Sequence, residues 1–193
     1  MSRQTAVESP ESGSSSDGPR GENVLVLASS MESDADERCV HLADEADGLL
    51  VVSLSEAPDR RIDTISARGG RPDRVAAISC DTTRGAAAAR FPSDGGTPDI
   101  ATVSDPGDLT GIGIHIDQLL TAWDGLDHVA VCVDSLTTLL QYSDPRAVFR
   151  FCHSVTRKAS DVGATTHFHL DPGTVDDQTR RTFQSLFDRT VEA

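Results

Sequence analysis

A short β-branched run over residues 129–133 constrains the fold most, because it ends abruptly on Asp134 and Ser135. The run is apolar at every position, as a strand buried on both faces of a parallel sheet must be. Ligands of open α/β sheets bind at the carboxyl ends of the strands, and a strand that ends on Asp can hold the Mg²⁺ of a nucleotide. Asp134 is therefore a candidate magnesium ligand and Ser135 a candidate nucleotide contact. An Asp that merely caps the next helix is the alternative.

Similar short apolar runs recur along the chain and alternate with helical patterns. We predict further strands at 24–27, 49–54, 74–80, 100–103, 164–170 and 189–193. We predict helices from Ser33 or Asp34 up to Gly48, and over 59–68, 109–123, 137–142, 145–163 and 175–187. In the helix over 109–123, Trp123 belongs to an apolar stripe and is expected to pack in the core. This alternation predicts a three-layer α/β fold, with a mostly parallel sheet flanked by helices.

The ends and the apolar content bound the organisation of the chain. Residues 1–20 are rich in Ser, Gly, Pro and Glu, and we expect a disordered N-terminal tail followed by one domain over 21–193. No apolar run reaches the ~18 residues that span a bilayer, and the N-terminus has no secretory signal pattern. We therefore expect no membrane association and a cytoplasmic location.

The charge is strongly acidic. Thirty-one acidic residues against 17 basic ones give a net charge of -14, and Lys158 is the only lysine. Such a surface repels phosphates, so nucleic acid is not an expected partner, although arginines at 60–61 and 68–74 could form a local basic cluster. Acid excess with almost no lysine favours a salt-loving archaeal origin, in which concentrated salt screens the repulsion. An ordinary acidic bacterial protein is the alternative.

Two further sets of residues are candidates for metal or redox chemistry. The four cysteines are scattered without a C-x-x-C pair, and we expect free, mostly buried thiols rather than a disulfide or a zinc finger. His167 and His169 lie two apart on a predicted strand and so share one face, with Asp171 just after them. They are candidate metal ligands, but histidines with a purely structural role are the more ordinary interpretation.

The segment after the first predicted strand lacks the chemistry of a phosphate-binding loop. Such a loop needs glycines that let backbone N–H groups converge, together with a lysine. Between Gly21 and Gly48 there is neither, and the segment carries acids at Glu32, Asp34, Asp36 and Glu37. Acids suit a helix N-terminus but exclude a triphosphate from it. Glu56, at the exit of the strand over 49–54, is a second candidate acid, with a solvated turn residue as the alternative.

Three segments resemble the RecA-like ATPases of the KaiC/RadA type, and more closely a set of haloarchaeal proteins that are degenerate relatives of them. These segments are VCVDSLTTLL, LLVVSLSEAP and GATTHFHLDPG; SDPGDLTGIGIHIDQLL is similar to the haloarchaeal set alone. In this resemblance Asp134 matches the Walker B acid, and Glu56 matches one of the family's paired glutamates, with Ser55 in place of the other. The Walker A loop should fall at residues 28–36, where an acid stands in the place of its lysine.

The resemblance implies a RecA-like core without a functional phosphate loop. We expect no ordinary ATP hydrolysis and no bound cofactor, and a regulatory or protein-interaction role, with a protein partner or a homo-oligomer. The alternative is a nucleotide or magnesium sensor, or an ATPase, that uses Glu56 and Asp134 with Mg-ATP held in a non-standard way.

Overall fold

The computed structural model describes residues 21–29, 34–54, 57–68, 72–80 and 99–192. The predicted tail over 1–20 and the candidate acid Glu56 lie outside these residues. So do residues 30–33 of the segment that replaces the phosphate loop.

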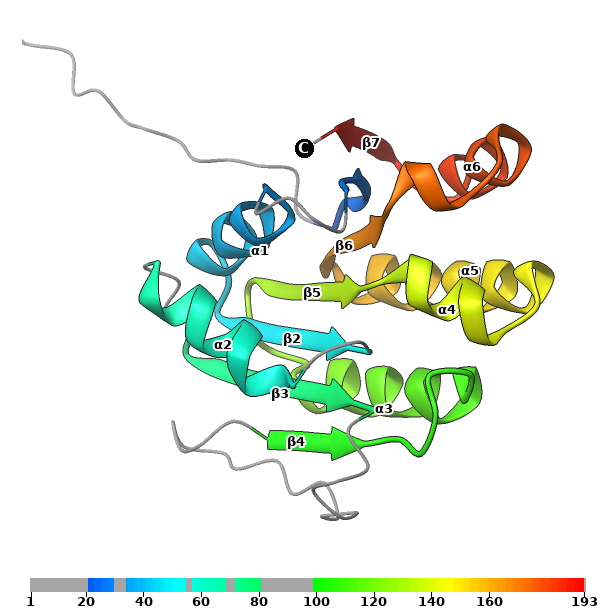
Figure 1. Cartoon of the computed structure of the whole chain (residues 1–193). Helices are drawn as coiled ribbons and strands as arrows, with labels where there is room; N and C mark the ends of the chain where they lie inside the picture. Colours follow the sequence, from blue (N-terminus) through cyan, green and yellow to red (C-terminus); the bar gives the residue numbers. More distant parts are fainter. Residues whose placement is uncertain (1–20, 30–33, 55–56, 69–71, 81–98, 193) are drawn as a thin grey trace, which may run out of the picture.

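The core of the protein is one sheet of seven parallel strands (Figure 1). The strands are β1 (Asn23–Leu27), β2 (Gly48–Ser53), β3 (Arg74–Ser79), β4 (Asp99–Thr102), β5 (Val129–Asp134), β6 (Thr165–Leu170) and β7 (Arg189–Glu192). Their order across the sheet is β4-β3-β2-β5-β6-β1-β7, so β5 is the central strand. Because all pairs are parallel, every strand ends at the same edge, and Asp134 lies at the middle of that edge.

Helices cover both faces of the sheet and make it a three-layer α/β fold, as predicted (Figure 1). They are α1 (Asp34–Asp44), α2 (Pro58–Ala67), α3 (Leu109–Ala122), α4 (Leu136–Tyr142), α5 (Pro145–Val162) and α6 (Asp177–Gln184). A 3-10 turn, η2 (Pro172–Thr174), precedes α6. In the described part of the chain, no helix combines the length and the apolar character needed to cross a bilayer.

The two-residue period of the strands divides the core into two sides. Ala130 and Cys132 of β5 pack with α1 and α2. Val131 and Val133 pack with the helices of the opposite face, where Trp123 is buried as predicted. Continuing the alternation places Asp134 on the side of α1 and α2.

All the predicted strands are present, with ends that differ by at most one residue. Four of the six helices agree as closely, and the first and the last differ more. The first predicted helix ends at Asp44 rather than at Gly48, because Gly48 begins β2. A Cβ on Gly48 would lie 2.7 Å from Leu126 Cδ1 and 3.0 Å from Trp123 Cε3, so a larger residue here would require these side chains to shift. The last predicted helix begins at Asp177, since the side chain of Asp176 caps it by accepting a hydrogen bond from Thr179 N.

Candidate functional site

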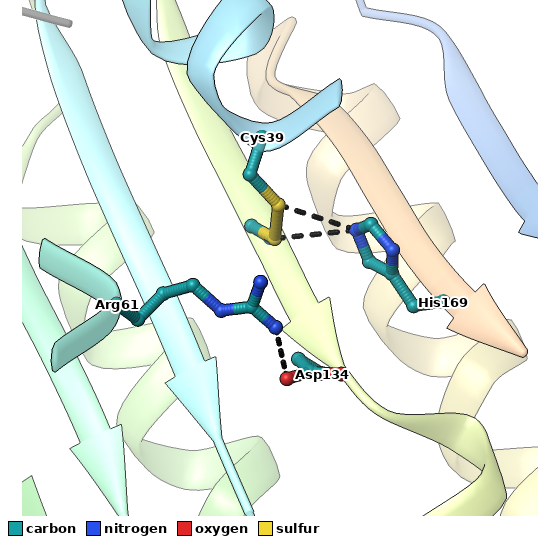
Figure 2. The surroundings of a disulfide bond; sticks show 5 residues. Cys39, Arg61, Asp134 and His169 are labelled. Atoms are coloured by element: carbon teal, nitrogen blue, oxygen red, sulfur yellow. Dashed lines mark hydrogen bonds and ion pairs between the residues drawn. A yellow bond between two sulfur atoms is a disulfide. The ribbon is translucent and has the colours of Figure 1, made fainter. Parts of the chain in front are cut away.

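Asp134 is paired with an arginine that was not among the predicted site residues. The guanidinium of Arg61 reaches from α2 and donates to Oδ2 of Asp134 in a close ion pair (Figure 2). The Arg61 side chain is only 4% exposed and that of Asp134 18% exposed. Removing two charges from water is costly, and each partner offsets the cost of the other only while both are present. The candidate magnesium ligand is therefore already neutralised by a buried cation.

The sequence of α2 contains the signal that could have placed Arg61. Ile62 and Ile65 pack against the sheet, and Arg61 lies four residues before Ile65, on the same side of the helix. Arg60, by contrast, is exposed. The two adjacent arginines thus point differently, and they do not form a basic cluster on the surface.

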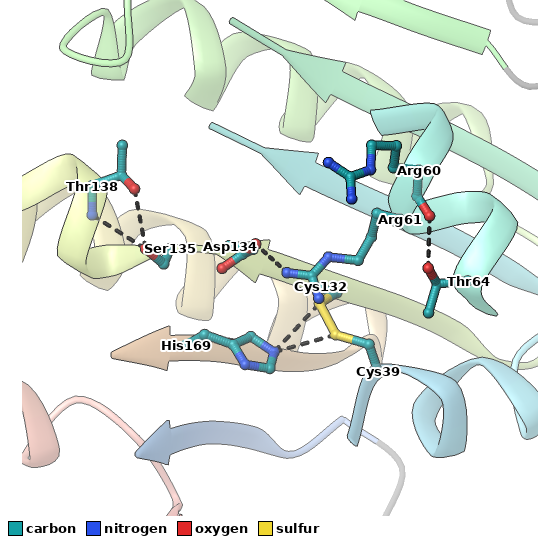
Figure 3. A network of polar contacts seen from close by, with 9 residues as sticks. All are labelled: Cys39, Arg60, Arg61, Thr64, Cys132, Asp134, Ser135, Thr138 and His169. Atoms are coloured by element: carbon teal, nitrogen blue, oxygen red, sulfur yellow. Dashed lines mark hydrogen bonds and ion pairs between the residues drawn. A yellow bond between two sulfur atoms is a disulfide. The ribbon is translucent and has the colours of Figure 1, made fainter. Parts of the chain in front are cut away.

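Ser135 serves as the N-cap of α4. Its hydroxyl accepts a hydrogen bond from Thr138 N at 3.2 Å and lies 3.1 Å from the Thr138 hydroxyl (Figure 3). The Asp134–Ser135 peptide bond is cis. The cap that was the alternative interpretation of Asp134 is thus supplied by the next residue, and Asp134 itself points at Arg61.

His169 and Asp171, which were predicted to form one metal site with His167, make contacts with different groups. Asp171 accepts a hydrogen bond from Gly173 N at 2.9 Å, as the cap of η2. His169 is 3% exposed, and its Nε2 lies 3.2 Å from Cys39 Sγ and 3.4 Å from Cys132 Sγ (Figure 3). His167 precedes it on β6, opposite Cys132 in the strand register. The structure therefore brings His169 together with two cysteines rather than with Asp171.

The prediction that all four cysteines are free thiols is wrong. Cys39 of α1 and Cys132 of β5 form a disulfide, although 93 positions separate them in the sequence. Cys80 and Cys152 are free. A pairing across 93 positions carries no spacing signal, because it arises only when α1 packs on the face of β5 that carries Cys132. The sequence indicated only that both cysteines are buried: Cys39 lies in the apolar stripe of its helix, and Cys132 lies in the middle of a buried strand.

Burial determines the protonation state of His169 and His167. Burial, with a smaller contribution from the Arg61 charge, lowers the pKa of His169 to about 3. Burial also lowers the pKa of His167 to about 3, with smaller contributions from His169, Arg189, Arg38 and His41. Both imidazoles are therefore neutral at neutral pH. Among the described residues, Cys39, Cys132 and His169 form the one group of three metal-ligand types whose ligand atoms all lie within 4.8 Å of one another.

The two free thiols, Cys80 and Cys152, are not activated for chemistry. Burial, with lesser contributions from the charges of Asp105 and Asp108, raises the pKa of Cys80 to about 11. Burial also raises the pKa of Cys152. Both therefore stay protonated at neutral pH, where the thiol is a poor nucleophile and a poor metal ligand.

Comparison with known proteins places the fold and the family. A protein of Pyrococcus horikoshii OT3, known from a structural study, is similar in fold, with a TM-score of 0.57 and 12% sequence identity. The similarity covers 91% of this chain and 83% of that one, and at this identity it shows the fold alone. No curated protein sequence matches the chain. The family of unknown function DUF7504 matches residues 21–193, and the chain therefore belongs to that family.

Proposed function

We propose that this chain is a non-catalytic domain of the RecA/KaiC-like type that acts as a regulatory or protein-interaction module. The observation that carries the proposal is the ion pair between Arg61 and Asp134. A Mg²⁺ ion at Asp134 would meet a guanidinium that is 4% exposed, and it would have to displace a cation that already neutralises the carboxylate. Displacement would leave Arg61 charged and without this carboxylate in the protein interior, which is strongly unfavourable.

The strand order is compatible with a nucleotide-binding site at the carboxyl edge of the sheet, but the residues after β1 argue against hydrolysis. β6 separates β1 from β5, so the carboxyl ends of these two strands lie on the order of 10 Å apart. A phosphate group after β1 and a metal ion at Asp134 would be close enough to share one nucleotide. The segment after β1, however, carries no lysine and no glycine between Gly21 and Gly48, so neither the cradle nor its charge is available.

A protein partner is the remaining way for such a domain to act. RecA-like proteins, which this chain resembles, assemble side by side. The partner class that we propose is therefore a second copy of this chain or an active relative of it. The net charge of -14 disfavours nucleic acid as the ligand.

Thermal unfolding in about 2–3 M KCl, with and without Mg-ATP, tests the proposal, because this salt screens the acidic surface. A ligand that binds the folded chain at about 100 times its Kd stabilises it by ~2.7 kcal/mol, which is readily measured as a rise in Tm. We expect no rise and no phosphate release. A rise that disappears in Asp134→Asn would instead support the nucleotide sensor. Light scattering over a range of protein concentrations then tests for self-assembly.

A further inference from the structure

Cys39, Cys132 and His169 form a buried group that the proposed function does not use. Cys132 and His169 come from the neighbouring strands β5 and β6, and Cys39 comes from α1, which covers them (Figure 2). All three residues are buried. Because two of the three stand on adjacent strands of the central sheet, their spacing is fixed by backbone hydrogen bonds rather than by a loop.

The distances suit a metal ion. Zn²⁺ lies about 2.3 Å from a cysteine sulfur and about 2.0–2.1 Å from an imidazole nitrogen, so tetrahedral geometry needs a sulfur–nitrogen separation of about 3.5 Å. His169 Nε2 already lies 3.2 Å from Cys39 Sγ and 3.4 Å from Cys132 Sγ. Only the two sulfurs have to move apart, to about 3.8 Å, after their bond is broken.

The imidazole of His169 is buried and has no strong hydrogen-bond partner among the described residues. Its Nδ1 is buried and has no hydrogen-bond partner among the described residues, while its Nε2 faces only sulfur, a weak hydrogen-bonding atom. Buried polar groups are seldom left in this state. The Nε2 of His169 faces both sulfurs at these distances, and a ring nitrogen of histidine is the commonest metal ligand in proteins.

We propose that the reduced protein binds one Zn²⁺ ion through the thiolates of Cys39 and Cys132 and the Nε2 of His169. Two thiolates and an imidazole select soft or borderline ions, chiefly Zn²⁺ and Cu⁺. Charge favours Zn²⁺, because two thiolates and Zn²⁺ sum to zero beside the already neutral Arg61–Asp134 pair. Cu⁺ would leave one uncompensated negative charge in the interior. Three protein ligands leave one of the four tetrahedral positions of Zn²⁺ without a ligand from these residues.

Disulfide and metal exclude each other at this site, because the same two sulfurs serve both. Reduction by a dithiol breaks the S–S bond: the dithiol gives up two electrons and two protons, becomes a cyclic disulfide, and leaves two protein thiols. Zinc binding then releases these two protons to solvent. We therefore expect binding by the reduced chain and none by the oxidised chain.

The test is a zinc titration of the full chain without a histidine tag, in metal-free KCl buffer, against a chromophoric chelator. The protein is first reduced and freed of the reductant without exposure to air. We expect one Zn²⁺ per reduced chain and a Kd raised more than about 100-fold in Cys39→Ser, Cys132→Ser and His169→Gln, since even residues that only support metal ligands cost ~10–100-fold. Cys80→Ser and His153→Gln, which change the same residue types elsewhere, should bind like the wild type.

A second measurement needs no variant and so does not depend on the folding of the substituted chains. Alkylation of the reduced wild type, followed by peptide mass spectrometry, should show that Zn²⁺ protects Cys39 and Cys132 and leaves the labelling of Cys80 unchanged. The proposal is overturned if reduced wild type binds no Zn²⁺, if it binds Cu⁺ but not Zn²⁺, or if the zinc is lost in Cys80→Ser or His153→Gln. Zinc binding by the oxidised chain would also overturn it.

Discussion

The side chain of Arg61 decides what Asp134 can do. An aspartate at the end of a central parallel strand is placed where ligands bind, but this one is engaged by a guanidinium from α2. The same position in the fold is therefore occupied by a structural ion pair.

Breaking this pair from one side should be strongly destabilising. We expect Arg61→Met to lower the free energy of unfolding by about 3 kcal/mol, because the Asp134 carboxylate loses its partner in a site that is only 18% exposed. Arg60→Met, which changes the exposed neighbour, should have an effect below about 0.5 kcal/mol. Guanidinium chloride unfolding of the two variants measures both values.

The double variant Arg61→Met/Asp134→Leu separates a buried-charge effect from simple loss of packing. Replacing both charges with apolar groups should recover most of the stability lost in Arg61→Met. Equal losses in the single and the double variant would show that the arginine acts through its packing and not through its charge.

At the scale of elements, the disulfide joins α1 to the central strand β5. It closes a loop between positions 93 apart, which restricts the unfolded chain somewhat more than a short loop would, because the entropy of loop closure grows only slowly with length. It also fixes the helix that carries Cys39 over the face where His169 lies.

Reduction should therefore weaken the fold. The loop-entropy relation for a separation of 93 gives a loss of about 4–5 kcal/mol in the free energy of unfolding. Unfolding with and without a phosphine reductant, in the presence of a metal chelator, measures this loss. Cys39→Ser has no disulfide to lose, so its stability should not respond to the reductant.

Two glycines at helices should respond oppositely to the same substitution. Gly163 follows α5 with φ at +71°, which favours glycine, so Gly163→Ala should cost about 1 kcal/mol. Gly113 lies inside α3, and a Cβ there would meet Phe151 at 3.8 Å, an ordinary contact. Gly113→Ala should stabilise by about 0.5–1 kcal/mol. Thermal unfolding of both variants under one condition gives the direction of each change in Tm. Changes in the same direction would contradict the roles given to the two glycines.

At the scale of the whole molecule, the charge of -14 governs how the fold responds to salt. Self-repulsion of this size opposes the compact state, and salt screens it. We expect the Tm to rise between about 0.2 M and 2 M KCl. The triple variant Asp124→Asn/Asp127→Asn/Asp161→Asn removes three exposed acids and should unfold at higher temperature in low salt, with a smaller salt response. An unchanged salt response would mean that general salting-out, and not charge screening, supports the fold.

The sequence by itself determined the elements and their buried faces. The apolar runs predicted all seven strands, the helical spacing predicted the helices, and the alternation of the two predicted a parallel three-layer fold. These features could be predicted because they depend on periodicity within short segments, which is written residue by residue. The position of Asp134 at the carboxyl edge of the sheet followed for the same reason.

Only the tertiary structure decided which side chains meet. Arg61 with Asp134, and Cys39 with Cys132 and His169, are contacts between elements 37 to 130 positions apart. Their existence depends on the strand order and on which helix covers which face, and neither is encoded in local spacing. The cysteine prediction failed for this reason, and the histidine prediction joined His169 to its sequence neighbour Asp171. The chemistry of the site follows from packing that becomes defined only when the whole sheet has formed.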